Sequence, residues 1–93
     1  MLIQHKLVGD KGMFFVGQGG TILAELVYTM SPAGKMIIEH TEVSDELKGK
    51  NVGLQLVSTA VDYARDHQIK IIPLCPFAKA VIDKRPDMHD VLS

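Results

Sequence analysis

The chain has 93 residues, of which 46% are hydrophobic and 23% are charged, and its formal net charge is −1. This profile is typical of a single globular domain, residues 1–93, with one modest core. Because duplex nucleic acid is wrapped by proteins with a large positive field, a chain with this charge is expected to have no nucleic-acid partner.

The N-terminal segment, residues 1–6, has no basic region followed by a long apolar stretch, which predicts the absence of a signal peptide. The apolar runs along the chain are too short to span a bilayer, so we expect no membrane partner. The single cysteine, Cys75, cannot form an internal disulfide, which fits a reducing compartment. Together these features predict a cytoplasmic protein.

The first half of the chain has the pattern of β-strands. Residues 13–16 are a short apolar run, the glycine-rich segment 17–20 follows, and residues 21–30 are again apolar, which predicts a β-hairpin. Pro and Gly in residues 31–34 predict a second turn, and residues 35–43 the next strand. Three or four successive strands with tight turns predict an antiparallel meander.

The second half of the chain has helical spacing. The polar segment 44–50 predicts a loop, and residues 52–67 carry apolar side chains at helical intervals, with Asn51 suited to the N-cap. Residues 69–74 predict a short strand, and residues 76–84 a second helix with proline at its first position. The chain is therefore predicted to adopt an α+β fold with two helices in its second half.

The loop before the first helix has the composition of an anion site. It reads Lys48-Gly49-Lys50-Asn51-Val52-Gly53. The first turn of a helix leaves N–H groups unpaired and carries partial positive charge, a combination that binds phosphate. Gly49 and Gly53 would let a diphosphate approach the backbone, and Lys48 and Lys50 add positive charge. An ordinary solvated loop before a helix is the alternative.

This loop resembles the [Q/R]-x-x-G-x-[G/A] segment of the GCN5-related N-acetyltransferases, which holds the pyrophosphate of coenzyme A. Residues 38–43 and 71–77 resemble the small members of that family of the YjdJ type, and the resemblance runs over about residues 12–92. Lys48 stands where the family prefers Gln or Arg, and Asn51 where it usually has its first glycine. The resemblance implies a mixed, mostly antiparallel sheet with a shortened N-terminal part.

The resemblance also implies the activity: transfer of an acetyl group from acetyl-CoA, a co-substrate, to an amine acceptor that is either a small molecule or a protein lysine. Coenzyme A would lie where the strand 35–43 separates from the strand 69–74. Pro73 has no N–H to donate to a sheet, which fits a strand end at such a separation. The alternative is that Pro73 only ends an ordinary edge strand. The shortened N-terminal part implies a shallow acceptor site, or one that a partner completes, and we expect a monomer or a weak homodimer.

The cofactor-binding residues predicted in this way come from four segments of the chain. They are Glu42, Val43, Lys48, Gly49, Lys50, Asn51, Val52, Gly53, Cys75, Pro76 and Lys79. Backbone N–H groups near Glu42 and Val43 are the expected donors to the oxyanion that develops on the thioester.

Cys75 is the first candidate for catalysis. It precedes Pro76 at the expected start of the last helix, where the positive helix end lowers the pKa of a thiol. A thiolate there could take the acetyl group before passing it to the amine, and the resemblance points the same way. A small buried hydrophobic residue is the alternative.

His40 is the second candidate. In a regular strand, Met36, Ile38, His40 and Glu42 share one face, which predicts that His40 and Glu42 lie beside the cofactor. A histidine with a nearby carboxylate could act as a general base near neutral pH. A partly buried histidine with an ordinary hydrogen bond is the alternative.

Two other functional classes remain open at this point. A non-catalytic module that holds coenzyme A or acyl-CoA would use the same loop but would need neither Cys75 nor His40, and a small interaction domain would need no cofactor. We expect no metal, because the histidines and the cysteine show no metal-binding spacing. The residues considered for that spacing are His40, His67, Cys75 and His89.

Overall fold

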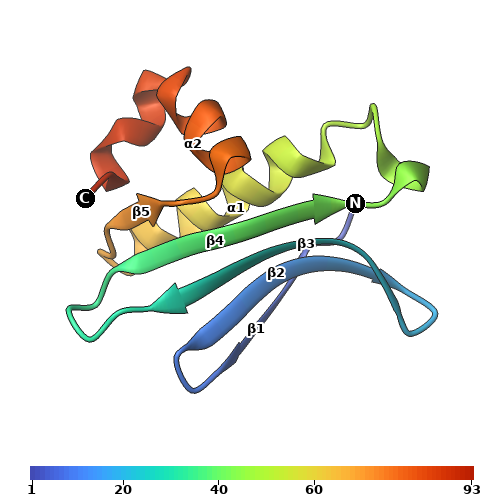
Figure 1. Ribbon diagram of the computed structural model, residues 1–93, viewed down its shortest axis with the longest axis horizontal. Helices are drawn as coiled ribbons and strands as arrows, with labels where there is room; N and C mark the ends of the chain where they lie inside the picture. Colours follow the sequence, from blue (N-terminus) through green and yellow to red (C-terminus); the bar gives the residue numbers. More distant parts are fainter.

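The computed structural model describes all residues from 1 to 93 and contains a five-stranded sheet with two α-helices on one face (Figure 1). In chain order the elements are β1 (Gln4–Val8), β2 (Lys11–Gln18), β3 (Thr21–Met30), β4 (Met36–Val43), the 3₁₀ turn η1 (Asp45–Leu47), α1 (Val52–Asp66), β5 (Ile71–Pro73), α2 (Pro76–Asp83) and the 3₁₀ segment η2 (Pro86–Val91). The predicted α+β fold, with its two helices in the second half, is confirmed. None of the helices combines the length and the apolar character needed to cross a membrane.

The strands lie in the sheet in the order in which they occur along the chain. β1 to β4 form an antiparallel meander, and β5 is parallel to β4. The mixed, mostly antiparallel sheet is therefore confirmed, and the sheet has four strands before α1, within the expected three or four. The fourth is the edge strand β1, to which the sequence pattern assigned no residues. Every residue of β1 is exposed, so the strand lacks the buried alternation by which strands are recognised.

The core lies between the sheet and the helices. Phe14 of β2, Leu26 and Tyr28 of β3 and Ile38 of β4 are almost fully buried against the apolar side of α1, which includes Leu56. No charged or polar side chain is buried in this core. Removal of apolar surface from water therefore stabilises the contact between helices and sheet.

A β-bulge interrupts β4 at Glu39. Val27 of β3 is opposite His40, whereas the next residue, Tyr28, is opposite Ile38, so Glu39 has no partner of its own in β3. A bulge of this kind shifts the alternation of side chains by one residue.

The bulge changes which side chains of β4 face the helices. Met36 and Ile38 precede it and are buried in the core, whereas Thr41, which follows it, lies on the helix side in contact with the chain before α2. His40 and Glu42 are exposed on the opposite, open face of the sheet. The prediction that Met36, Ile38, His40 and Glu42 share one face is therefore wrong, because it assumed a regular strand.

The pairing of β4 with β5 is short. It runs from Met36 opposite Ile71 to Ile38 opposite Pro73, and the carbonyl of Ile38 then accepts the N–H groups of Leu74 and Cys75, both at 3.0 Å. The chain turns into α2 at this point, so residues 39–43 of β4 continue without pairing to β5 (Figure 1). The two strands separate where the sequence predicted, and Pro73 is the last paired residue.

Candidate functional site

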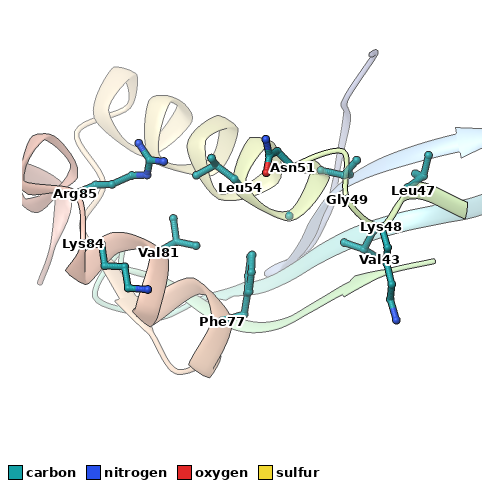
Figure 2. Close-up of a pocket in the computed structure, with 12 residues that line it drawn as sticks. Val43, Leu47, Lys48, Gly49, Asn51, Leu54, Phe77, Val81, Lys84 and Arg85 are labelled. Carbon is teal, nitrogen blue, oxygen red and sulfur yellow. The ribbon is translucent and has the colours of Figure 1, made fainter. Parts of the chain in front are cut away.

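A cavity of about 590 Å³ lies where the loop after β4 enters α1, on the side that faces α2 (Figure 2). Phe77 and Val81 extend from α2 toward α1, and Leu54 lies on the α1 side of the same space. The strand end, the loop and both helices thus contribute to one cavity.

Six of the eleven predicted cofactor-binding residues line this cavity, and they are Val43, Lys48, Gly49, Asn51, Val52 and Gly53. The other five do not line it, and they are Glu42, Lys50, Cys75, Pro76 and Lys79. Glu42 lies on the open face of the sheet because of the bulge, and Lys79 forms an ion pair with Asp83 at 2.9 Å within α2.

The cavity also has lining residues that the sequence analysis did not select. They are Leu47, Leu54, Phe77, Val81, Lys84 and Arg85. The adjacent basic pair Lys84-Arg85, placed just before Pro86, was a detectable signal for an anion-binding element. What the sequence could not indicate is that α2 packs beside α1 and brings this pair to the cavity.

The charge around the cavity is one-sided. Its lining includes Lys48, Lys84 and Arg85 and has no Asp or Glu. The amino group of Lys48 is 2.8 Å from the carboxylate of Asp45, and this hydrogen bond lowers the pKa of Asp45 below its ordinary value. Lys84 and Arg85 form no ion pair, so their positive charges are available to an anion in the cavity.

The loop before α1 has two residues in the left-handed region. Gly49 has φ of 81° and Asn51 has φ of 58°. Asn51 occupies the N-cap position, but its side chain makes no capping hydrogen bond. The predicted N-cap position of Asn51 is therefore confirmed, and the residue adopts a left-handed conformation there without a side-chain cap. Residues 52–54 at the start of α1, all of which line the cavity, therefore have first-turn N–H groups without a side-chain acceptor.

Cys75 is the N-cap residue of α2, with Pro76 as the first helical residue. It is a free thiol with 5% exposure, and its Sγ lies 3.5 Å from Oγ1 of Thr41. Burial opposes ionisation, but hydrogen bonds from the backbone of Ala78, the Thr41 side chain and the backbone of Phe77 bring the pKa of the thiol below its ordinary value. Cys75 is therefore both buried and placed at a helix N-terminus.

His40 lies on the other face of the sheet from Cys75. Its Nε2 is 3.2 Å from Oε2 of Glu42 and 3.5 Å from Oε2 of Glu25. Cys75 instead contacts Thr41, whose side chain lies on the helix side of β4. The structure therefore does not bring the two predicted catalytic residues together.

Comparison with known families gives a match to the GCN5-related N-acetyl-transferases over residues 13–91. The chain belongs to the GCN5-related N-acetyltransferase family. The resemblance identified in the cofactor loop is confirmed at the level of this family, whose members are acyltransferases. Assignment to the YjdJ type stays a prediction.

Several solved structures have a fold similar to that of this family member, and this chain covers different shares of their lengths. A GCN5-like candidate N-acetyltransferase from Staphylococcus aureus is 36% identical, with 97% of this chain and 87% of that protein covered, and has a TM-score of 0.75. A ribosomal-protein-alanine N-acetyltransferase from Brucella melitensis is 14% identical over 82% of this chain and 61% of its own, with a TM-score of 0.63. An acetyltransferase from Clostridium acetobutylicum, solved with acetyl-CoA, is 14% identical over 83% and 57%, with a TM-score of 0.62.

The last two similarities concern the fold alone, and the chain spans less than two thirds of either protein. Comparison of this family member with curated proteins gave no match.

Proposed function

We propose that this chain is an acetyl-CoA-dependent N-acetyltransferase that moves an acetyl group to an amine acceptor, either a small molecule or a protein lysine. The observation that carries the proposal is the separation of β4 from β5 beyond Ile38, next to the cavity at the start of α1. Val43 from the unpaired end of β4 and Phe77 from the chain after β5 both line that cavity. The acetyl-CoA bound by the similarly folded Clostridium acetobutylicum protein supports the same co-substrate here.

The pyrophosphate of coenzyme A would bind at the start of α1. The lining residues fit a dianion, because the N–H groups of residues 52–54 have no side-chain cap and no carboxylate lines the cavity. Lys84 and Arg85 supply positive charge on the opposite side of the cavity. Lys50 and Lys79 are weaker candidates for binding the pyrophosphate, since neither residue lines the cavity.

The pantetheine arm and the thioester would follow the part of β4 that does not pair with β5. Backbone groups of residues 39–43 on that side have no ladder partner in β5. An N–H near Glu42 or Val43 is our candidate donor to the oxyanion that develops when the thioester carbonyl is attacked. In this role Glu42 contributes its backbone, since its side chain lies on the open face.

Cys75 is our candidate for a covalent route. Its thiolate would attack the thioester carbonyl carbon, the bond from that carbon to the coenzyme A sulfur would break, and coenzyme A would leave and take up a proton. A neutral acceptor amine would then attack the acetyl-cysteine, release the Cys75 thiolate and lose a proton to solvent. Direct attack of the amine on acetyl-CoA is the alternative, and it needs no cysteine.

A non-catalytic coenzyme A-binding module is the second candidate function. It is favoured by one observation: neither Cys75 nor His40 lines the cavity. His40 would act as a general base only for an acceptor that approaches from the open face of the sheet, where its partners Glu25 and Glu42 lie.

One experiment separates these candidates. The purified protein is mixed with acetyl-CoA, native mass spectrometry records bound coenzyme A and covalent acetyl groups, and release of free coenzyme A is followed with polyamines and with a lysine-containing peptide. An acetyl adduct that is absent in Cys75→Ala supports the covalent route, and turnover that persists in Cys75→Ala supports direct transfer. Binding without turnover of any amine supports the module, and the absence of binding contradicts both functions.

A further inference from the structure

We propose that Glu25, His40 and Glu42 form a zinc site on the open face of the sheet. These side chains lie on adjacent strands β3 and β4, away from the cavity and from both helices. The proposal is independent of acetyl transfer, because none of the three residues lines the cofactor cavity.

The spacing of the three side chains suits one small cation. Nε2 of His40 is 3.2 Å from Oε2 of Glu42 and 3.5 Å from Oε2 of Glu25, and one ligand atom from each residue lies within 4.8 Å of the others. Zinc bonds to imidazole nitrogen and carboxylate oxygen are about 2.0–2.2 Å long, which at a tetrahedral angle separates neighbouring ligand atoms by about 3.3–3.6 Å. A zinc ion would therefore need only small side-chain movements to bind all three.

The strand register places two carboxylates beside each other, an arrangement that favours binding of a cation. Glu25 and Glu42 are directly opposite each other in the antiparallel pair of β3 and β4. Like charges opposite each other in a sheet are destabilising, and a divalent cation between the carboxylates converts the repulsion into attraction. The bulge at Glu39 turns His40 to this same face, where it supplies a nitrogen ligand between the two acids.

Ser44 provides an independent observation at the same place. Its Oγ is buried and has no hydrogen-bond partner. Ser44 lines a small cavity of about 140 Å³ together with Glu25 and Glu42. This cavity lies beside the two carboxylates and has room for the water that would complete a four-coordinate zinc site.

The ligand atoms, one imidazole nitrogen and two carboxylate oxygens, favour zinc over magnesium and calcium. Imidazole with two carboxylates suits zinc and neighbouring transition metals, whereas magnesium and calcium prefer oxygen ligands alone. The expectation of a metal-free chain rested on the spacing of histidines and the cysteine along the sequence. It did not consider carboxylates from a neighbouring strand.

The test is calorimetric titration of tag-free protein, stripped of metal with EDTA and dialysed, with Zn²⁺ alone. We expect one zinc per chain, and an affinity at least about tenfold weaker in His40→Ala and in Glu25→Gln. Glu46→Gln and His67→Ala are the matched controls, because both residues are exposed and lie outside the cluster, and they should bind like the unmodified chain. Cobalt substitution should give the strong visible absorption of a tetrahedral site that is lost in His40→Ala.

Several results would overturn the proposal: no binding, equal binding by His40→Ala and the unmodified chain, or Mg²⁺ affinity equal to that of Zn²⁺. Circular dichroism of each variant verifies that the fold is retained. If spermine instead of Zn²⁺ binds the cluster with the same dependence on His40 and Glu25, the site is a cation site for an amine and the zinc assignment fails. The acetyl-transfer assay is not a readout here, so failure of the zinc site leaves the proposed enzymatic function unaffected.

Discussion

The ring of Phe77 lies directly against Gly53. A Cβ atom added at Gly53 would be 2.7 Å from Cζ and 2.9 Å from Cε2 of that ring. Gly53 is in the first turn of α1 and Phe77 in the first turn of α2, so the missing side chain lets the two helix starts approach each other at the cavity. The loop pattern suggested Gly53 for close approach of a diphosphate, and the structure gives it this packing role as well.

Gly53→Ala should reduce coenzyme A binding without unfolding the protein. Phe77 is 45% exposed, so its ring can move away from the new methyl group. Alanine also favours a helix interior over glycine by about 1 kcal/mol, so the free energy of unfolding should change by less than about 1 kcal/mol. Because the methyl group and the displaced ring both occupy the cavity lining, we expect coenzyme A affinity, measured by calorimetry, to fall about tenfold.

The double variant Gly53→Ala with Phe77→Ala is the control for this steric explanation. Without the ring, the extra methyl group has space, so the double variant should bind coenzyme A within about threefold of Phe77→Ala alone. Unchanged affinity in the single variant would show that coenzyme A does not contact this part of the chain.

Gly12→Ala should destabilise the fold strongly. A Cβ at Gly12 would lie 2.2 Å from Cζ and 2.4 Å from Oη of Tyr28, whose side chain is fully buried and cannot move aside. Overpacking of this kind lowers the free energy of unfolding by about 1–3 kcal/mol. We expect a decrease near the upper end of that range, measured by urea denaturation. Gly17→Ala in the same strand is the matched control, because its Cβ would meet no atom closer than 3.6 Å. Equal stability of the two variants would contradict this explanation.

The stability of the fold should decrease when His5 becomes protonated. Its ring stacks on Phe14 with centroids 4.3 Å apart, and its Nε2 is 2.6 Å from the hydroxyl of Tyr28. The ring of His5 is partly desolvated by these contacts, although the residue as a whole is exposed, and this desolvation, followed by the positive charge of His67, lowers the pKa of His5 below its ordinary 6.5 in the folded state. The unfolded chain therefore binds more protons, so this contribution is present above pH 6.5 and is lost as the pH falls through the folded pKa.

Urea denaturation at a series of pH values from about 8 to about 5 measures this effect, since most carboxylates stay ionised over that window. His5→Gln should flatten the decrease in the free energy of unfolding as the pH falls. An unchanged slope in His5→Gln would assign the pH dependence to another group.

The thiol of Cys75 should ionise below the ordinary range for cysteine. Burial raises its pKa, but hydrogen bonds from Ala78, Thr41 and Phe77 together have the larger effect and lower it. Thiolate absorbance in the ultraviolet, recorded against pH, should give a midpoint below that of an ordinary cysteine. Thr41→Val removes the hydroxyl 3.5 Å from Sγ and should raise the midpoint. A midpoint unaffected by Thr41→Val would show that the backbone groups alone set the pKa.

Lys84 and Arg85 should contribute to coenzyme A affinity more than Lys79 does. Both line the cavity and neither forms an ion pair, whereas Lys79 lies outside it and is paired with Asp83. We expect Lys84→Gln and Arg85→Gln each to weaken coenzyme A binding about threefold to tenfold in low salt, with a smaller effect in high salt because the contacts are electrostatic. Lys79→Gln in α2, the helix that ends just before Lys84, is the matched control. Loss of affinity in Lys79→Gln alone would restore the original prediction for that lysine.

Local sequence patterns were sufficient for most of the fold. The β2–β3 hairpin, the turn before β4 and the two helices follow from glycine and proline at turns and from apolar spacing over consecutive residues. The cofactor loop was recognised for the same reason, because Gly49, Asn51 and Gly53 lie within a few residues of one another. These features depend on interactions between near neighbours along the chain.

The bulge at Glu39 shows why the candidate catalytic face was predicted wrongly. A bulge is defined by how two strands pair, and here it depends on β3, whose residues were not part of the pattern from which His40 was placed. A shift of one residue moves every following side chain to the other face. Local alternation therefore placed Met36 and Ile38 correctly and His40 and Glu42 on the wrong side.

The sequence by itself determined the order and type of the elements and the family to which the chain belongs, because turn chemistry, hydrophobic spacing and the cofactor motif are local. The tertiary structure decided the addition of the exposed strand β1, the face on which His40 lies, and the position of Lys84 and Arg85 beside α1. Each of these depends on contacts between residues far apart in the chain, and such contacts are selected by packing of the whole core.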